Sequence, residues 1–323
     1  MKKLLIYSEG GTFGMGHVVR CLCLADELVR RGASVEFITD PAERVGFARI
    51  ANSPYPCHDL TTDLPDGFDG CLIDVEKYPG TETLEKFKNK YNRLIIIGGV
   101  SYPPLVSGDG LCDLQIYQGE LFDYQETNRS LNGTKYLIVD PAYAECRQNV
   151  DGPIVVTQGG VDPYRMTERV VMSLVGLDWR MTVIRGVARE ELRVAAPENF
   201  DIINAPDSLR PYFDGASLAI VATGMSCYEA LAAGVPCLLI NISPDHERTA
   251  VELERRGCAW NMGQWHEFNG DILRARVLHL LAHLDELTRM GAAGRALVDG
   301  RGVGRVAEKI MTLSHNLPQG LSR

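Results

Sequence analysis

Three glycine-rich turns constrain the fold of this 323-residue chain more than any other feature. Each turn follows a short apolar run and precedes a segment whose apolar residues have helical spacing. The turns span residues 10–17, 158–162 and 223–226. A buried strand, a tight turn and a helix in this order are typical of a parallel βαβ unit. Their repetition predicts an α/β fold with parallel strands in both halves of the chain.

The expected elements alternate along the whole sequence. Strands are predicted at residues 4–7, 34–39, 70–74, 93–98, 153–157, 180–184, 217–221 and 236–240. Helices are predicted at residues 17–31, 83–91, 167–175, 226–233, 249–257 and 299–313. Between residues 140 and 152 the periodicity is lost, and Pro141, Asn149 and Gly152 interrupt the chain. We therefore expect two α/β domains, residues 1–148 and 149–323, with a last helix that can cross back onto the first domain.

The charge balance and the cysteines exclude several classes of protein. The chain has 33 basic and 42 acidic residues, a net charge of −9, so nucleic acid and anionic membranes are not expected partners. The longest apolar stretch, residues 230–242, contains Gly234 and Pro236 and cannot span a membrane. Nine scattered cysteines without a CxxC pair predict free thiols in a reducing cytoplasm. We expect a cytoplasmic protein without a membrane span.

Common cofactor and hydrolase motifs are missing. The sequence has no GxGxxG dinucleotide fingerprint in its first turn, no GxxxxGK[ST] phosphate loop and no GxSxG nucleophile elbow. Asp245, His246 and Glu247 are adjacent, and adjacent residues rarely converge on one metal ion. We therefore predict no metal and no cofactor, and we expect these three residues to form a solvated loop with one member that contacts substrate.

The turn at residues 223–226 is the best phosphate-binding candidate. Thr223, Gly224, Met225 and Ser226 precede a helix, whose free N–H groups and positive dipole end attract anions. Glu229 lies one turn further and could accept hydrogen bonds from two ribose hydroxyls. The residue pattern leaves a second interpretation open, in which Ser226 is only an N-cap and Glu229 only favours the helix dipole.

The first turn places His17 at the start of a helix. The helix dipole there favours a neutral imidazole, the form that a general base needs. Arg20 lies three residues on and could face the same cleft or pair with an acidic residue. The alternative is that His17 only caps or packs, since a lone histidine is a weak signal.

Five segments resemble, in the right order, motifs of the pseudaminic-acid pathway UDP-sugar hydrolases. This family is related to the spore-coat polysaccharide proteins and to the glycosyltransferases that add GlcNAc to lipid-linked peptidoglycan precursors. The segments are residues 14–22 (GMGHVVRCL), 140–147 (DPAYAECR), 158–163 (QGGVDP), 229–236 (EALAAGVP) and 297–302 (LVDGRG). The resemblance covers nearly the whole chain.

The resemblance implies two Rossmann-like domains in the GT-B arrangement, with an interdomain cleft. It implies that the C-terminal domain holds UDP, and that His17 activates water against the anomeric carbon without a metal. The residues that it places at UDP are Gly159, Gly160, Thr223, Gly224, Met225, Ser226 and Glu229. Those that it places at the sugar are Gly14, Gly16, Arg20, Tyr78, Asp245 and His246.

Three functions are compatible with these residues. The first is a UDP-sugar hydrolase of the pseudaminic-acid type, which serves surface-glycan biosynthesis. The second is a GT-B glycosyltransferase in which His17 activates an acceptor hydroxyl or amine. The third is a nucleotide-sugar-binding protein without catalysis. A transferase that acts on lipid-linked acceptors needs an exposed apolar or basic patch. The sequence shows no clear patch of this kind, and the acidic balance favours hydrolysis.

Overall fold

The N-terminal lobe is built on a seven-stranded parallel sheet with the order β3-β2-β1-β4-β5-β6-β7. The computed structural model describes residues 2–10, 14–98, 105–106, 110–118, 126–187 and 197–313. The strands are β1 (Lys3–Ser8), β2 (Ser34–Thr39), β3 (Cys57–Asp59), β4 (Gly70–Asp74), β5 (Leu94–Gly98), β6 (Leu114–Tyr117) and β7 (Ser130–Asn132). Three helices accompany them: α1 (Gly16–Arg30), α2 (Arg44–Ala51) and α3 (Thr81–Lys90).

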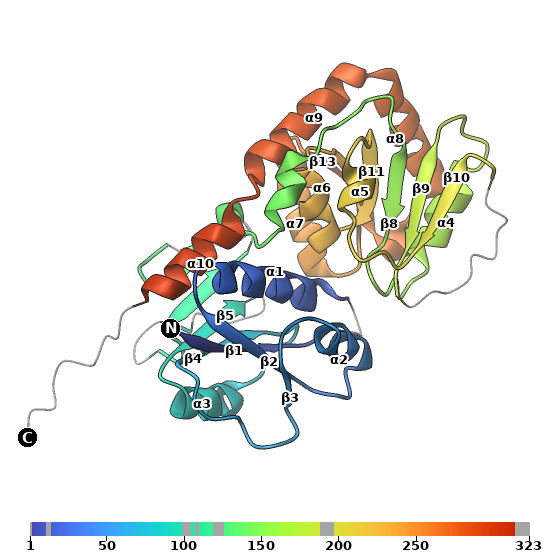
Figure 1. Cartoon of the computed structure of the whole chain (residues 1–323). Coiled ribbons are helices and arrows are strands. Elements are labelled where there is room, and N and C mark those ends of the chain that lie inside the picture. Colours follow the sequence, from blue (N-terminus) through green and yellow to red (C-terminus); the bar gives the residue numbers. More distant parts are fainter. Residues whose placement is uncertain are drawn as a thin grey trace, which may run out of the picture.

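The C-terminal lobe repeats this plan with a six-stranded parallel sheet, ordered β10-β9-β8-β11-β12-β13. Its strands are β8 (Ile154–Thr157), β9 (Met181–Arg185), β10 (Phe200–Asn204), β11 (Leu218–Ala222), β12 (Cys237–Asn241) and β13 (Ala259–Gln264). Its helices are α4 (Met166–Leu174), α5 (Arg210–Phe213), α6 (Met225–Ala232), α7 (Pro244–Arg255), η3 (Trp265–Glu267), α8 (Gly270–Ala282) and α9 (Leu284–Leu297). Figure 1 shows the two lobes side by side, with α1 and α10 where they meet.

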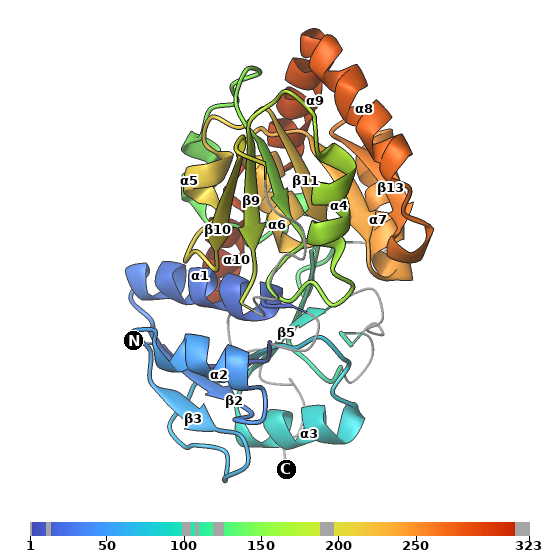
Figure 2. The ribbon, with the colours of Figure 1, turned by 90° about the vertical axis from the view of Figure 1, so that its right-hand side faces the viewer.

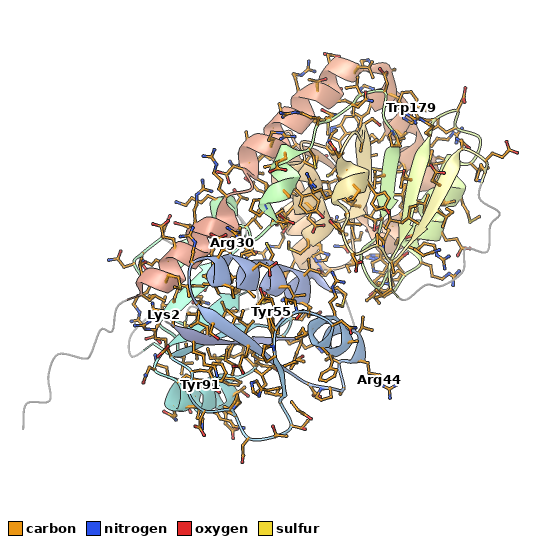
Figure 3. The ribbon with its side chains drawn as sticks, in the orientation of Figure 1. Lys2, Arg30, Arg44, Tyr55, Tyr91 and Trp179 are labelled. Carbon is orange, nitrogen blue, oxygen red and sulfur yellow. The ribbon has the colours of Figure 1, made fainter. Side chains whose placement is uncertain are left out.

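The chain crosses between the lobes twice. The first crossing contains the short helices η1 (Thr134–Tyr136) and η2 (Pro141–Glu145), and the predicted domain boundary falls just after it. The second crossing is α10 (Gly302–Thr312), whose residues Val303, Val306 and Ile310 are buried in the core of the N-terminal lobe. Lys2, labelled in Figure 3, donates a hydrogen bond of 2.6 Å from Nζ to the carbonyl of Met311. The last described helix is therefore part of the first lobe.

Both sheets reverse their strand order in the middle. The reversal lies between β1 and β4 in one sheet and between β8 and β11 in the other. In open parallel sheets, ligands bind beyond the carboxyl ends of the strands at such a point. All three glycine-rich turns follow these strands, two of them after β1 and β8 and the third after β11. The view in Figure 2 shows β9 and β11 above α1, which lies at the junction of the lobes.

The helix that follows β12 corrects one expectation. The sequence predicted a helix from residue 249 and a loop before it, whereas α7 begins at Pro244. Pro244 fits the first helical position because its fixed φ is already helical and its missing N–H is not needed there. The Ser243 hydroxyl accepts a 3.2 Å hydrogen bond from the His246 N–H and caps the helix. Asp245 and His246 therefore lie in a helical first turn, and not in a loop.

Candidate active site

His17 and Asp74 form a dyad at the point where the first sheet reverses. Asp74 is the last residue of β4 and pairs with Ser8 of β1, so it lies beneath the helix that carries His17. The distance from His17 Nδ1 to Asp74 Oδ1 is 2.7 Å. The Asp74 side chain is fully buried, whereas that of His17 is 26% exposed. The Asp74 carboxylate only accepts hydrogen bonds and therefore favours a proton on Nδ1, whereas the Arg20 Nη2, which only donates, lies 2.9 Å from the same nitrogen.

Arg20 and Cys21 complete the surroundings of Asp74. The Arg20 Nε donates to Asp74 Oδ2 at 2.5 Å, Nη2 donates to Oδ1, and the Cys21 thiol is 3.3 Å from Oδ2. Burial raises the pKa of Asp74, but the Arg20 charge and the His17 and Arg20 hydrogen bonds outweigh it and hold this pKa well below its ordinary value. Of the two expectations for Arg20, the structure shows the ion pair with an acid.

Further carboxylates surround His17. Burial raises the pKa of Glu9, as do Glu43 and Asp40, while the Tyr7 hydrogen bond and the His17 charge lower it. Burial also raises the pKa of Glu76, whereas the His17 charge lowers it. These acids follow β1, β2 and β4, so they gather at the carboxyl edge of the first sheet.

The glycine turn after β11 leads into α6. Gly224 occupies the N-cap position, and no side chain caps this helix. Ser226 is the second helical residue, so the interpretation of Ser226 as an N-cap is wrong. Thr223 is buried and its hydroxyl donates to Asn241 Oδ1 at 2.7 Å, which fixes the turn against β12. The positive end of α6 is thus free of a side-chain cap and suited to an anion.

Glu229 is a buried residue of α6. The residue is only 8% exposed. Burial raises the pKa of Glu229 to about 8, a hydrogen bond from Tyr143 opposes this, and Asp140 adds to it.

The glycine turns of the two lobes meet across the junction. A Cβ atom added to Gly16 would lie 2.9 Å from the Met225 Cγ, and a Cβ atom added to Gly160 would lie 3.1 Å from the Met15 Cγ. Gly159 adopts a φ of +83°, which a residue with a side chain rarely takes. The structure therefore brings Gly16 and Met225 together. It also places Gly160 beside Met15, which follows Gly14.

Of the remaining predicted sugar-side residues, Tyr78 lies in the loop before α3, and Asp245 and His246 lie in the first turn of α7. The Tyr78 hydroxyl is 3.2 Å from Thr81 Oγ1, at the start of α3. Burial lowers the pKa of His246 to about 4, with Asp245 opposing the shift, so the imidazole is neutral at neutral pH. Within the described chain, the buried His246 Nδ1 has no hydrogen-bond partner. The Asp245 carboxylate is 3.6 Å from Arg248.

Sequence reasoning missed Asp74 and Tyr143 as site residues. Asp74 ends an apolar run that was correctly predicted as a strand, and an acid at the carboxyl end of a buried strand is a signal that could have found it. The sequence offers no comparable signal for the contact of Tyr143 with Glu229. Both residues enter the site through their partners, His17 and Glu229.

The described residues contain neither a cluster of metal ligands nor a helix that could cross a membrane. No three His, Cys, Asp or Glu side chains among residues 2–10, 14–98, 105–106, 110–118, 126–187 and 197–313 are placed to hold a metal ion together. Over the same part of the chain, no helix has both the length and the apolar character that a membrane crossing requires.

Comparison with solved structures defines the class of fold. The fold resembles that of spinosyn forosaminyltransferase SpnP, with a TM-score of 0.68 and 15% sequence identity. The match covers 97% of this chain and 100% of SpnP. The chain also matches the S. aureus MnaA–UDP co-structure over 100% of both chains, with a TM-score of 0.64 and 12% identity. These similarities confirm the predicted GT-B arrangement of two α/β lobes.

A curated relative supports the resemblance seen in the sequence. The chain is 25% identical over 337 aligned positions to the spore coat polysaccharide biosynthesis protein SpsG of Bacillus subtilis (strain 168). The alignment covers 95% of this chain and 97% of SpsG. The resemblance to the spore-coat polysaccharide proteins is thereby confirmed. No family model matches the chain.

Proposed function

We propose that this protein is a metal-independent UDP-sugar hydrolase that releases UDP by attack of water at the anomeric carbon. The observation that carries the proposal is the 2.7 Å contact between His17 Nδ1 and Asp74 Oδ1. The proposal assigns the Nδ1 proton to this contact, so that Nε2 accepts the proton of water. The dyad stands at the carboxyl edge of one sheet, where the glycine turns of the other lobe meet it. The proposed substrate class is that of UDP-linked diacetamido-trideoxyhexoses, used in surface-glycan biosynthesis.

The proposed reaction uses the two lobes for different tasks. His17 Nε2 takes a proton from water while the water oxygen forms a bond to the anomeric carbon. The bond from that carbon to the β-phosphate oxygen breaks, and its electron pair leaves with UDP. Asp74 stabilises the imidazolium that forms, as the carboxylate of a catalytic triad does. The uncapped N-terminus of α6 stabilises the charge on the departing diphosphate.

The comparisons support the nucleotide half of this proposal. The S. aureus MnaA structure of similar fold contains UDP, and SpsG is named for polysaccharide biosynthesis. For this chain we assign UDP to the turn at residues 223–226, with Gly159 and Gly160 beside it. We assign the ribose to Glu229 and the sugar to the His17 side, with Gly14, Gly16, Tyr78, Asp245 and His246 around it. Arg20 acts through Asp74 and orients the dyad.

A GT-B glycosyltransferase is the second candidate. The fold shared with a forosaminyltransferase favours it. In this case His17 removes the proton from an acceptor hydroxyl or amine instead of from water. The two candidates share the donor, the nucleotide site and the base, so they differ only in what attacks the anomeric carbon.

The direct test is UDP release from a panel of UDP-sugars, without acceptor and without added metal. The panel contains UDP-linked diacetamido-trideoxyhexoses and UDP-GlcNAc. We expect release from one member that disappears in the His17→Ala variant. Tight binding without release overturns hydrolysis and favours the transferase. Absence of both binding and release overturns the assignment of a UDP-sugar ligand.

A further inference from the structure

Two methionines reach across the junction of the lobes in opposite directions. Met15 is the N-cap residue of α1, and its Cγ would lie 3.1 Å from a Cβ atom added to Gly160, in the turn after β8. Met225 is the first residue of α6, and its Cγ would lie 2.9 Å from a Cβ atom added to Gly16 of α1. Each lobe therefore places one methionine against a glycine of the other lobe. Met15 and Gly16 directly precede His17 in the chain.

Each methionine is anchored in the lobe that carries it. Met15 packs against the core cluster of the N-terminal lobe that contains Val18 and Cys21. Met225 packs against the core cluster of the C-terminal lobe that contains Leu231. A methionine side chain is unbranched and fills irregular gaps, so it suits a contact between two separately folded bodies. The two contacts therefore connect the cores of the lobes.

The turn that receives Met15 has no room to move away from it. A Cβ atom added to Gly186, which follows β9, would lie 2.1 Å from the Gly160 carbonyl oxygen. On the other side, a Cβ atom added to Gly10 would lie 3.5 Å from the Met15 Sδ, and the Gly10 carbonyl accepts a 2.9 Å hydrogen bond from Gly46 of α2. Close contacts thus run from α2 through Met15 to the end of β9. A larger residue at position 160 has to displace Met15 or separate the lobes.

The neighbouring methionine, and not the backbone, requires a glycine at positions 16 and 160. Both Gly16 and Gly160 lie outside the left-handed region of φ. Gly16 opens α1, where alanine is the better helix former. The nearest atoms to an added Cβ belong to Met225 at Gly16 and to Met15 at Gly160, whereas Gly14, in the same turn, has no described atom within 4 Å. A methyl group at position 16 or 160 therefore tests the contact between the lobes.

We infer that Met15 and Met225 are positioning residues, which fix the separation between His17 and the nucleotide-binding turn of the other lobe. This inference rests on the proposed function, in which His17 acts on a sugar whose diphosphate is held at residues 223–226. Misplacement of reacting groups by about 1 Å can cost on the order of 10²-fold in rate. The sizes of the residues at these contacts should therefore control kcat. UDP, which is assigned to the C-terminal lobe, should be much less sensitive to the separation.

A disulfide cross-link tests whether the lobes have this separation in solution. A Cβ atom added to Gly16 would lie 3.7 Å from the Met225 Cβ, within the range of about 3.5–4.5 Å that a disulfide requires. We expect the full-length Gly16→Cys/Met225→Cys variant to form this bond when oxidised glutathione accepts the electrons of the two thiols. Peptide mass spectrometry identifies the product. Gly14→Cys/Met225→Cys is the control and should react far more slowly. If both pairs react equally, the separation is not fixed and the inference is wrong.

An exchange of sizes tests whether the separation controls turnover. Gly16→Ala should lose about tenfold in kcat for UDP release, because its methyl group meets Met225 and displaces His17 from the nucleotide turn. Gly16→Ala/Met225→Ala should recover most of this loss. Gly160→Ala and Gly160→Ala/Met15→Ala repeat the exchange at the second contact. UDP affinity, measured by calorimetry, should be closely similar in each single variant and its double variant.

Gly14→Ala is the control for the exchange, because it adds the same methyl group without a contact. Its effect on kcat should be the same with and without Met225→Ala. Full activity of Gly16→Ala, or a loss that Met225→Ala does not restore, contradicts the inference. If the wild-type protein binds a UDP-sugar without releasing UDP, hydrolysis fails and the same exchange is measured on the affinity for that sugar. A protein that forms the cross-link but binds no UDP-sugar contradicts the proposed function, and with it the role of the contacts.

Discussion

The two halves of the site use opposite means to hold charge. On the N-terminal side, a fully buried carboxylate is held by Arg20 and His17 at hydrogen-bond distance, with further acids nearby. On the C-terminal side, α6 offers an uncapped helix end, and no charged side chain of the described residues donates a hydrogen bond to the buried Glu229. In the proposed function, one half moves a proton, whereas the other receives an anion through backbone N–H groups. The GT-B arrangement lets each property be tested separately.

The largest effect is expected for Asp74→Asn. The change leaves the largely buried Arg20 charge without its counter-ion, which costs about 3–5 kcal/mol of unfolding free energy. Because the pKa of Asp74 is lowered in the folded protein, its stabilisation is present above about pH 4 and is lost as the pH falls further. Denaturant unfolding at pH 7 and pH 3 measures both effects. The exposed pair of Asp285 with Arg289 is the control, and Asp285→Asn should scarcely change stability.

His17→Ala should act on turnover alone. Loss of the general base should reduce kcat on the order of 10²-fold, while UDP affinity should stay nearly unchanged. Steady-state rates and a UDP titration give the two quantities. His58→Ala is the matched control, because His58 also pairs with an acid, Glu36, at 2.6 Å but lies away from the glycine turns. Equal losses of turnover and affinity in His17→Ala would show a structural role.

Gly224→Ala separates the anion site from the fold. The Gly224 φ of 178° suits any residue and nothing lies within 4 Å of an added Cβ, so the fold should persist, with a loss of no more than about 1 kcal/mol from the poorer N-cap. A phosphate that approaches this backbone would meet the new methyl group, and UDP affinity should fall about tenfold. Gly14→Ala has equally open space but lies on the other half of the site. If Gly14→Ala weakens UDP binding more, the division of labour between the halves is wrong.

The smallest effect is expected at an ion pair between the lobes. Arg49 of α2 donates at 2.8 Å to Asp207, which lies on the loop after β10. Both side chains are exposed, so the pair is screened by solvent and contributes little. Arg49→Ala should change kcat/KM by less than about fivefold, and added salt should reduce that difference. A loss as large as that of His17→Ala would show that this contact controls the relative position of the lobes.

The sequence predicts much of the fold because parallel strands that are buried on both faces form short apolar runs. The runs at residues 34–39 and 70–74 coincide with β2 and β4. The three-residue strands β3 and β7 are too short to show a period, and β13 carries Asn261 and Gly263 in an otherwise mixed run. Helices α8 and α9 escaped prediction because their polar and apolar residues are not sharply separated. Their burial depends on contacts with distant elements.

The candidate site divides in the same way. His17 and the turn at residues 223–226 can be found from glycines at strand ends, since that signal is local. For Arg20 the sequence left two alternatives open, a position facing the cleft or an ion pair with an acidic residue. It could not decide between them because the partner, Asp74, is distant in the sequence and lies on β4. The contact of Tyr143 with Glu229 depends on how the linker packs on α6. No local pattern encodes such a contact.

The most direct test of the account is the fate of heavy-oxygen-labelled water during turnover. If His17 directs water to the anomeric carbon, the released UDP carries no label, because the bond between carbon and the phosphate oxygen breaks. Mass spectrometry of UDP from the wild-type reaction measures this, with His17→Ala as the background. Unlabelled UDP whose release requires His17 is the predicted result. Heavy oxygen in the β-phosphate of UDP would show attack at phosphorus and would contradict the account.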